Sequence, residues 1–163
     1  MTQRLDYRTT DPNALKGMLE IEKYVTGSNL KRDLLELVKL RASQINGCIC
    51  CIGMHTKEAL ETGEYEQRLN ALEEWRKTTI FSEREKAALA WTEALTLISE
   101  NEISDTLYKT VRGFFSEEQL IALTMDIIAI NGWNRLAKSF STVPESYDSS
   151  QKESPNKRSE ACT

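Results

Sequence analysis

The sequence predicts an all-α protein, a bundle of about six to seven helices, on three observations. The three prolines are Pro12, Pro144 and Pro155, so the strongest helix breaker is absent from the long interval between the first two. Glycines follow the ends of periodic apolar segments, as at Gly27 and Gly47, where helices commonly end. No alternating run of strand-forming residues and no internal repeat occurs.

Capping residues and apolar spacing define the first three predicted helices. Asp11 caps a helix that has Pro12 in its first turn, and Gly27 ends it. The next helix spans about residues 28–45, where leucine, valine and isoleucine recur at intervals of three and four. The third helix begins near Cys48 and runs to about residue 61.

The second half of the chain contains the clearest helix starts. A charged amphipathic segment covers residues 64–75, and Ser82 with a glutamate three residues later forms a capping box. A short helix covers residues 104–111. Ser116 then opens a second capping box, which leads a long, mostly apolar helix to about Lys138.

Length and composition predict one domain followed by a tail. A chain of 163 residues lies in the middle of the single-domain range, so we expect one all-α domain over residues 1–140. From residue 141 onward serine, proline, glutamate and lysine dominate, which predicts a disordered tail over residues 141–163.

Charge and hydropathy exclude several functional classes. The net charge is −4 and the isoelectric point is near 5.2, which argues against nucleic acid or an anionic membrane as a partner. The longest apolar stretch, residues 120–130, is interrupted by Asp126 and is too short to span a bilayer. The first 15 residues lack the apolar run of a secretory signal. We therefore expect a cytoplasmic protein.

Chemistry is concentrated in one short segment. Three of the four cysteines occur within residues 48–51, and the single histidine, His55, follows four residues after Cys51. At about 100° per residue, Cys48, Cys51 and His55 share one face of a helix, whereas Cys50 points away.

This placement suits thiol redox chemistry. The amide groups and dipole at the start of a helix favour a thiolate, and a neighbouring imidazole takes the proton or stabilises the anion as its cation. Two cysteines three positions apart can also close a disulfide, so that one sulfur attacks and the other resolves.

The cysteine cluster could also reflect simple packing of small side chains or the binding of a cofactor. A zinc site needs four ligands, but one face offers only three, with Cys162 in the tail. A c-type haem requires a histidine at position 52, and an iron–sulfur cluster would lack a fourth cysteine. A thioredoxin fold requires strands that are not predicted. We expect neither a metal nor an organic cofactor.

Glu36 is followed, after eleven intervening residues, by the segment 48–57 that contains the cysteines and His55. This spacing resembles the core signature of the alkylhydroperoxidase D and carboxymuconolactone decarboxylase superfamily. The segments 81–91 and 130–135 are also similar to that family. The resemblance covers roughly residues 30–138. Within the superfamily the decarboxylase branch lacks the redox cysteine pair, so this chain is more similar to the peroxidase branch.

The resemblance implies an all-α bundle whose subunits assemble as trimers or hexamers. It also implies that Cys51 is the peroxidatic cysteine, Cys48 its resolving partner, and His55 with Glu36 a proton relay. In alkylhydroperoxidase D a second histidine precedes the second cysteine, and Cys50 stands at that position here. Helical spacing alone is equally compatible with a solvent-exposed Glu36.

The function expected from these observations is the reduction of hydroperoxides through a Cys48–Cys51 disulfide, recycled by a dithiol or protein reductant. Two alternatives remain open at this point. The same residues could serve a general thiol–disulfide oxidoreductase, or the chain could be a redox-sensing oligomer without enzymatic activity. Repeated turnover with an added reductant distinguishes an enzyme from a sensor, which oxidises once per subunit.

Overall fold

The computed structural model describes residues 2–143, so most of the predicted tail at 141–163 lies outside the described residues. Within residues 2–143 the chain forms eight α-helices, two 3-10 helices and no strand, which confirms the all-α class. The elements in chain order are α1 (Tyr7–Thr10), η1 (Pro12–Leu15), α2 (Lys16–Thr26), α3 (Arg32–Asn46), α4 (Ile49–Glu61), α5 (Glu66–Ala71), η2 (Leu72–Lys77), α6 (Glu83–Thr96), α7 (Asp105–Arg112) and α8 (Glu117–Ser139).

Three differences raise the helix count above the predicted six to seven. The predicted helix between Asp11 and Gly27 begins as the 3-10 helix η1 and continues as α2. The four-residue helix α1 was not predicted because it is too short for an apolar period, and the Asp6 carboxylate caps it by accepting from the Arg8 and Thr9 amides. The predicted segment 64–75 divides into α5 and the 3-10 helix η2, in which Glu74 is non-helical.

The helix starts that capping residues predict are confirmed, but the second predicted helix begins at Arg32 instead of about residue 28. The capping boxes at Ser82 and Ser116 are both complete, and the Ser104 side chain accepts from the Leu107 amide at the start of α7. The Asp11 carboxylate accepts from the Asn13 amide and so caps η1. Hydroxyl and carboxylate caps therefore stabilise the starts of five of the ten described elements, namely α1, η1, α6, α7 and α8.

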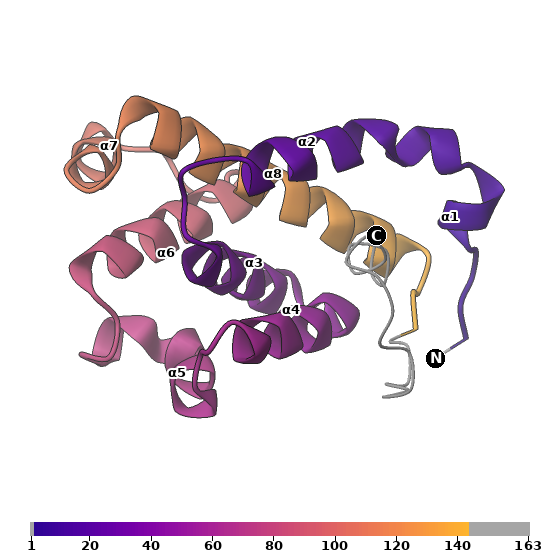
Figure 1. Ribbon diagram of the computed structural model, residues 1–163, viewed down its shortest axis with the longest axis horizontal. Coiled ribbons are helices and arrows are strands. Elements are labelled where there is room, and N and C mark those ends of the chain that lie inside the picture. Colours follow the sequence, from indigo (N-terminus) through magenta and orange to yellow (C-terminus); the bar gives the residue numbers. More distant parts are fainter. Residues whose placement is uncertain (1, 144–163) are drawn as a thin grey trace.

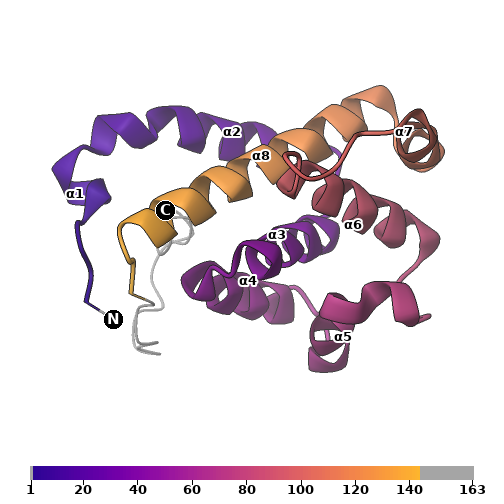
Figure 2. The same cartoon turned by 180° about the vertical axis from the view of Figure 1, so that it is seen from behind.

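The long helix α8 lies between α2 on one side and α3 with α4 on the other (Figure 1). The view from behind gives the same order (Figure 2). Helix α3 packs against α4, α6 and α8, so it is the central element. Its side chains Leu37, Val38 and Leu40 are fully buried, and on α8 Leu123 and Ile127 are buried equally deeply. Any side chain on the inner face of α3 is thus held among three other helices.

The buried tryptophans connect the helices through polar contacts as well as apolar area. The indole nitrogen of Trp133 on α8 donates to Glu22 on α2 at 3.0 Å. The indole of Trp91 on α6 donates to Thr124 on α8 at 3.0 Å. Among the described helices, none has the length and apolar character needed to cross a membrane.

Candidate active site

The turn between α3 and α4 places the cysteine segment. Gly47 ends α3 in the left-handed conformation with φ 62°, where a glycine has no steric penalty. The Gly47 amide donates to the carbonyl of Gln44, and the Cys48 amide donates to that of Ser43, both at 3.0 Å. Cys48 is consequently the N-cap residue of α4, and its sulfur lies at the positive end of the helix dipole.

Cys48 and Cys51 form a buried pair of thiols. Their exposed fractions are 2% and 0%, and both are free thiols in the structure. Their apolar neighbours come from α3 and α8, namely Ala42, Ile130 and Ala137. Cys50 is also buried, but its sulfur is not a free thiol, so the redox pair available in the described residues is Cys48 with Cys51.

The two thiols differ in which one loses its proton first. The hydrogen bond from the Cys51 thiol lowers the pKa of Cys48 to about 7, and the Cys51 amide acts in the same direction against burial. The positive charges of Lys138 and His55 lower the pKa of Cys48 further. The same hydrogen bond and burial raise the pKa of Cys51. In the reduced pair the negative charge therefore lies on Cys48, with the proton on Cys51.

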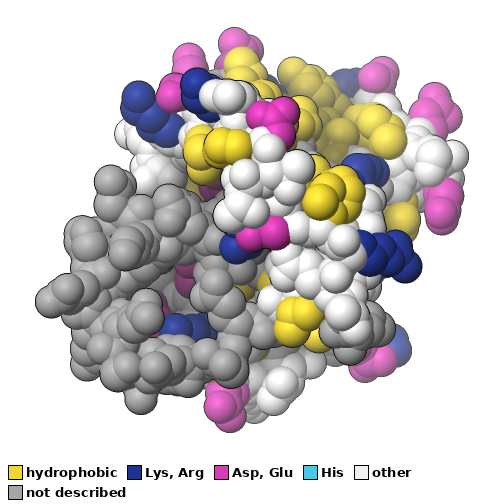
Figure 3. Space-filling view, turned by 90° about the vertical axis from the view of Figure 1, so that its right-hand side faces the viewer, with side chains coloured by type: hydrophobic (Ala, Val, Ile, Leu, Met, Phe, Trp, Pro, Cys, Tyr) yellow, Lys and Arg dark blue, Asp and Glu magenta, His cyan; other side chains and the backbone are white. Residues whose placement is uncertain are grey.

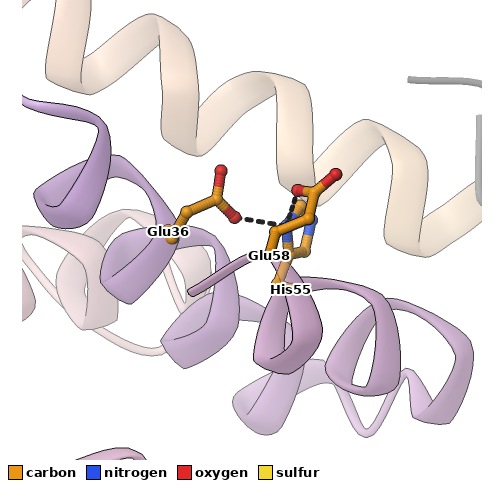
Figure 4. Close-up of side chains that lie close together, drawn as sticks. All are labelled: Glu36, His55 and Glu58. Carbon is orange, nitrogen blue, oxygen red and sulfur yellow. Dashed lines mark hydrogen bonds and ion pairs between the residues drawn. The ribbon is translucent and has the colours of Figure 1, made fainter. Parts of the chain in front are cut away.

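The structure brings the predicted Glu36 and His55 together across the α3–α4 contact (Figure 4). The distance from His55 Nδ1 to Glu36 Oε2 is 2.9 Å, and a second carboxylate oxygen, Oε2 of Glu58, lies 3.4 Å from the same nitrogen. Glu36 and His55 are both buried, so the alternative of a solvent-exposed Glu36 is wrong. The inward face of α3 buries this carboxylate because α4 covers it.

Charge pairing decides the protonation of this group. Burial opposes a charged His55, but the carboxylates of Glu36 and Glu58 outweigh burial and raise the pKa of His55. Burial would raise the pKa of Glu36, yet the hydrogen bond and positive charge of His55 lower it, and the charge of Lys39 adds to this effect. The arrangement thus favours an imidazolium paired with a carboxylate.

An amide network ties the α3–α4 turn to α8. The Asn134 amide donates to Ser43 Oγ at 3.1 Å and accepts from the Asn46 amide at 2.9 Å. Lys138 on α8 also donates to the Asn46 carbonyl. The Asn134 side chain opposes the rise in the pKa of Cys51 by a hydrogen bond to that thiol. This network holds the cysteine turn in place relative to α8.

The ligand atoms of Glu36, His55 and Glu58 lie within 4.8 Å of one another, which is close enough to hold a cation. The two contacts of His55 Nδ1 have the lengths of a hydrogen bond and an ion pair, so a shared proton accounts for the convergence. We assign no metal to these residues. The absence of a metal and of an organic cofactor stays a prediction.

Four polar residues around the site were missed in the sequence: Glu58, Lys39, Asp126 and Asn134. Helical spacing could have indicated two of them, because Glu58 lies three residues after His55 and Lys39 three after Glu36. Asp126 was visible only as the charge that interrupts an apolar stretch. Local sequence gives no sign that Asn134 lies beside Ser43.

Comparison with known sequences identifies relatives. The model of the carboxymuconolactone decarboxylase family matches residues 12–94. The uncharacterized protein YdfG of Bacillus subtilis is 43% identical over 137 residues, which cover 84% of this chain and 93% of that protein. The uncharacterized protein Rv2313c of Mycobacterium tuberculosis is 31% identical over 104 residues, which cover 64% of this chain and 36% of that protein.

Solved structures share the fold. A protein of unknown function from Agrobacterium tumefaciens, ATU0492, described as a candidate antioxidant defence protein AhpD, is 38% identical with a TM-score of 0.86, covering 90% of this chain and all of that one. An uncharacterized peroxidase-related protein from Silicibacter has a TM-score of 0.73 at 18% identity, covering 83% of this chain and 72% of that one. The debrominase Bmp8 has a TM-score of 0.74 at 19% identity, covering 85% and 74%. The last two show similarity of fold alone.

Proposed function

Because this chain belongs to the carboxymuconolactone decarboxylase family, we propose that it is a cysteine-based peroxidase that reduces hydroperoxides through a Cys48–Cys51 disulfide. The observation that carries the proposal is a buried pair of free thiols, one with a pKa of about 7, at the start of the helix that carries His55, whose imidazole is paired with the buried Glu36 of α3. The similarity to the Agrobacterium protein and its description support the same activity.

The reaction has two covalent steps. A thiolate attacks one oxygen of the hydroperoxide, so that an S–O bond forms, the O–O bond breaks, and an alkoxide leaves and takes a proton. The second sulfur then attacks the sulfenic sulfur, an S–S bond forms, and hydroxide leaves as water after taking another proton. A dithiol or protein reductant returns two electrons and two protons to the pair.

We assign the attack to Cys51, the role that the family resemblance implies, and the resolving step to Cys48. The electrostatics of the pair add a condition, because the anion of the reduced pair lies on Cys48. Attack by Cys51 therefore begins with transfer of its proton to the Cys48 sulfur. His55, held as imidazolium by Glu36, supplies the proton for the leaving alkoxide.

Burial favours a peroxide over the alternative substrate class. A general thiol–disulfide oxidoreductase must present its attacking sulfur to a bulky disulfide, whereas Cys48 and Cys51 are almost completely buried. A small hydroperoxide needs far less room. A redox-sensing oligomer would use the same pair but would oxidise only once per subunit.

The test is consumption of cumene hydroperoxide with dithiothreitol as the reductant. We expect many turnovers per subunit for the wild type and none for Cys51→Ser. Cys50→Ser is the matched control, because Cys50 is outside the proposed pair, and it should retain turnover. Consumption of a single equivalent by the wild type, despite excess reductant, would identify a sensor and contradict the proposal.

We also propose that the chain forms a homo-oligomer, a trimer or hexamer. Large apolar side chains reach the surface on several helices, among them Ile49, Ile121 and Ile128. Figure 3 shows apolar groups exposed between charged ones on one face of the molecule. Light scattering should give three or six times the subunit mass, and a mass near 18.6 kDa at micromolar concentration would contradict assembly.

A further inference from the structure

A second buried group of charges lies beside the proposed active site, centred on Asp126 of α8. Its side chain has no exposed surface, and neither carboxylate oxygen has a hydrogen-bond partner within the described residues. The nearest opposite charge is Lys39 Nζ on α3, at 3.6 Å from Oδ1. An aspartate buried without hydrogen bonds is costly to keep in a core, so its presence requires a reason.

Lys39 links Asp126 to another helix. Its Nζ lies 2.9 Å from Glu22 Oε2 on α2, and the other oxygen of Glu22 accepts the indole hydrogen bond of Trp133. The three charged side chains therefore come from three helices, α2, α3 and α8. Lys39 donates a direct hydrogen bond to Glu22, whereas its distance to Asp126 is longer and is that of an ion pair.

This group is coupled to the His–Glu pair through α3. Lys39 lies three residues after Glu36, on the same side of the helix, and its positive charge lowers the pKa values of Glu36 and His55. The negative charge of Glu36 and the positive charge of His55 act in turn on Asp126. The charges that face Asp126 from the packed helices are Lys39 and Glu36 of α3, Glu22 of α2 and His55 of α4.

Carboxyl groups outnumber the cations in this region. The six charged side chains concerned are Glu22, Glu36, Glu58 and Asp126 against Lys39 and His55. A buried excess of negative charge is unfavourable, so the region retains a proton near neutral pH. Burial raises the pKa of Asp126 to about 7 against the effect of Lys39, which makes this carboxyl the group that holds it.

We propose that Asp126 and Lys39 are positioning residues of the active site, whose paired charges control whether His55 carries its proton. An ionised Asp126 offsets the charge of Lys39 and stabilises the imidazolium of His55. A protonated Asp126 leaves Lys39 opposed by Glu22 alone, so that His55 releases its proton more readily. The inference rests on the proposed function only for its effect on peroxide reduction, because the coupling itself is a property of the folded protein.

The single histidine makes the coupling measurable without any activity assay. The titration of the imidazole by NMR reports His55 alone. Asp126→Asn removes the offsetting negative charge and should lower the pKa of His55 by about 0.5 to 1 pH unit, whereas Lys39→Met should raise it by a similar amount. Asp105→Asn, on the exposed surface of α7, is the matched control and should leave the titration unchanged.

Opposite shifts in the two variants support the inference, and an unchanged His55 pKa in Asp126→Asn overturns it. If Asp126→Asn or Lys39→Met does not fold, the titration of His55 in Cys48→Ser still decides, because that variant lacks the thiol of pKa about 7 that also interacts with His55. Coupling to a carboxyl that titrates near pH 7 gives a His55 titration broader than a single-site curve, and an ideal single-site curve overturns the inference. If the wild type shows no peroxide turnover but the two variants show the expected shifts in the pKa of His55, the proposed function is wrong and the coupling is still supported.

Discussion

Helices α4 and α8 have different kinds of residue at the N-cap position, with different consequences. At the N-cap of α8, the Ser116 hydroxyl accepts from the Gln119 amide, and the Gln119 side chain accepts from the Ser116 amide. At the N-cap of α4 stands Cys48, without a side-chain capping bond. A hydroxyl cap neutralises the first-turn amides, whereas a sulfur leaves their positive field available to a thiolate.

Helices α2, α3 and α5 also lack a side-chain cap, so what distinguishes the start of α4 is the thiol that stands there. An N-cap side chain contributes about 1 kcal/mol, which α8 and α6 retain and α4 lacks. Helix α4 is held instead by its packing on α3 and by the Gly47 turn that precedes it. The reactive helix is therefore stabilised from its sides and not from its start.

The largest expected effect comes from removing one sulfur at a time. Cys51→Ser should abolish peroxide consumption, including the first stoichiometric event. Cys48→Ser should consume about one equivalent, stop at a sulfenic acid and become prone to further oxidation, because the resolving thiol is missing. Single-turnover consumption, with mass spectrometry of the product, measures both variants.

The same pair of variants sharpens the contrast between the two helix starts. Cys48→Ser places a hydroxyl at the N-cap of α4, as at Ser116, and should raise the free energy of unfolding by about 0.5 to 1 kcal/mol in urea. If Cys48→Ser is inactive and Cys51→Ser still reacts stoichiometrically, the assignment of attacking and resolving sulfurs is reversed.

A smaller but measurable effect follows from the positive charge of His55. His55→Gln removes a cation that lowers the pKa of Cys48, so the midpoint of the thiolate-dependent rate should move from about pH 7 to higher pH. The rate should fall, because His55 no longer supplies the proton for the leaving alkoxide, but it should not be abolished, because both sulfurs remain. Alkylation by iodoacetamide and peroxide consumption, each followed against pH, should show the same displacement. Glu36→Gln should shift both profiles less and in the same sense, and identical profiles would exclude Glu36 from the relay.

The His55–Glu36 pair should also leave a signature in the pH dependence of stability. The pKa of His55 is raised above 6.5, so its contribution is fully present below that pH and is lost as pH rises through the folded value. The pKa of Glu36 is lowered below 4.5, so its contribution is present above that pH and is lost as pH falls. The stability difference between wild type and His55→Gln should therefore be largest between pH 4.5 and 6.5. A difference independent of pH would contradict the ion pair.

The smallest expected effect concerns the serine that caps α8. Ser116→Ala removes the cap of α8 and should lower the free energy of unfolding by about 1 kcal/mol, measured by urea denaturation. Peroxide turnover and the pH midpoint should stay unchanged, because Ser116 is remote in sequence from the thiols and belongs to a different helix start. A shifted midpoint in Ser116→Ala would show that the two helix starts are not independent.

Features that depend on neighbouring residues could be predicted from the sequence. The capping boxes at Ser82 and Ser116, the end of α3 at Gly47 and the common helix of Cys48 and His55 all follow from spacings of a few residues. Such features are set by the backbone geometry of one helix, and they hold whatever packs around it. The sequence thereby located the reactive segment and its class of chemistry.

Features that depend on which helix faces which could not be obtained in this way. Glu36 is nineteen residues from His55, and its spacing allowed either burial or exposure until the packing of α3 on α4 was known. Asp126 reaches Lys39 only because α8 crosses α3. Ionisation of a buried group depends on every charge within several ångströms, and tertiary contacts alone bring those charges together.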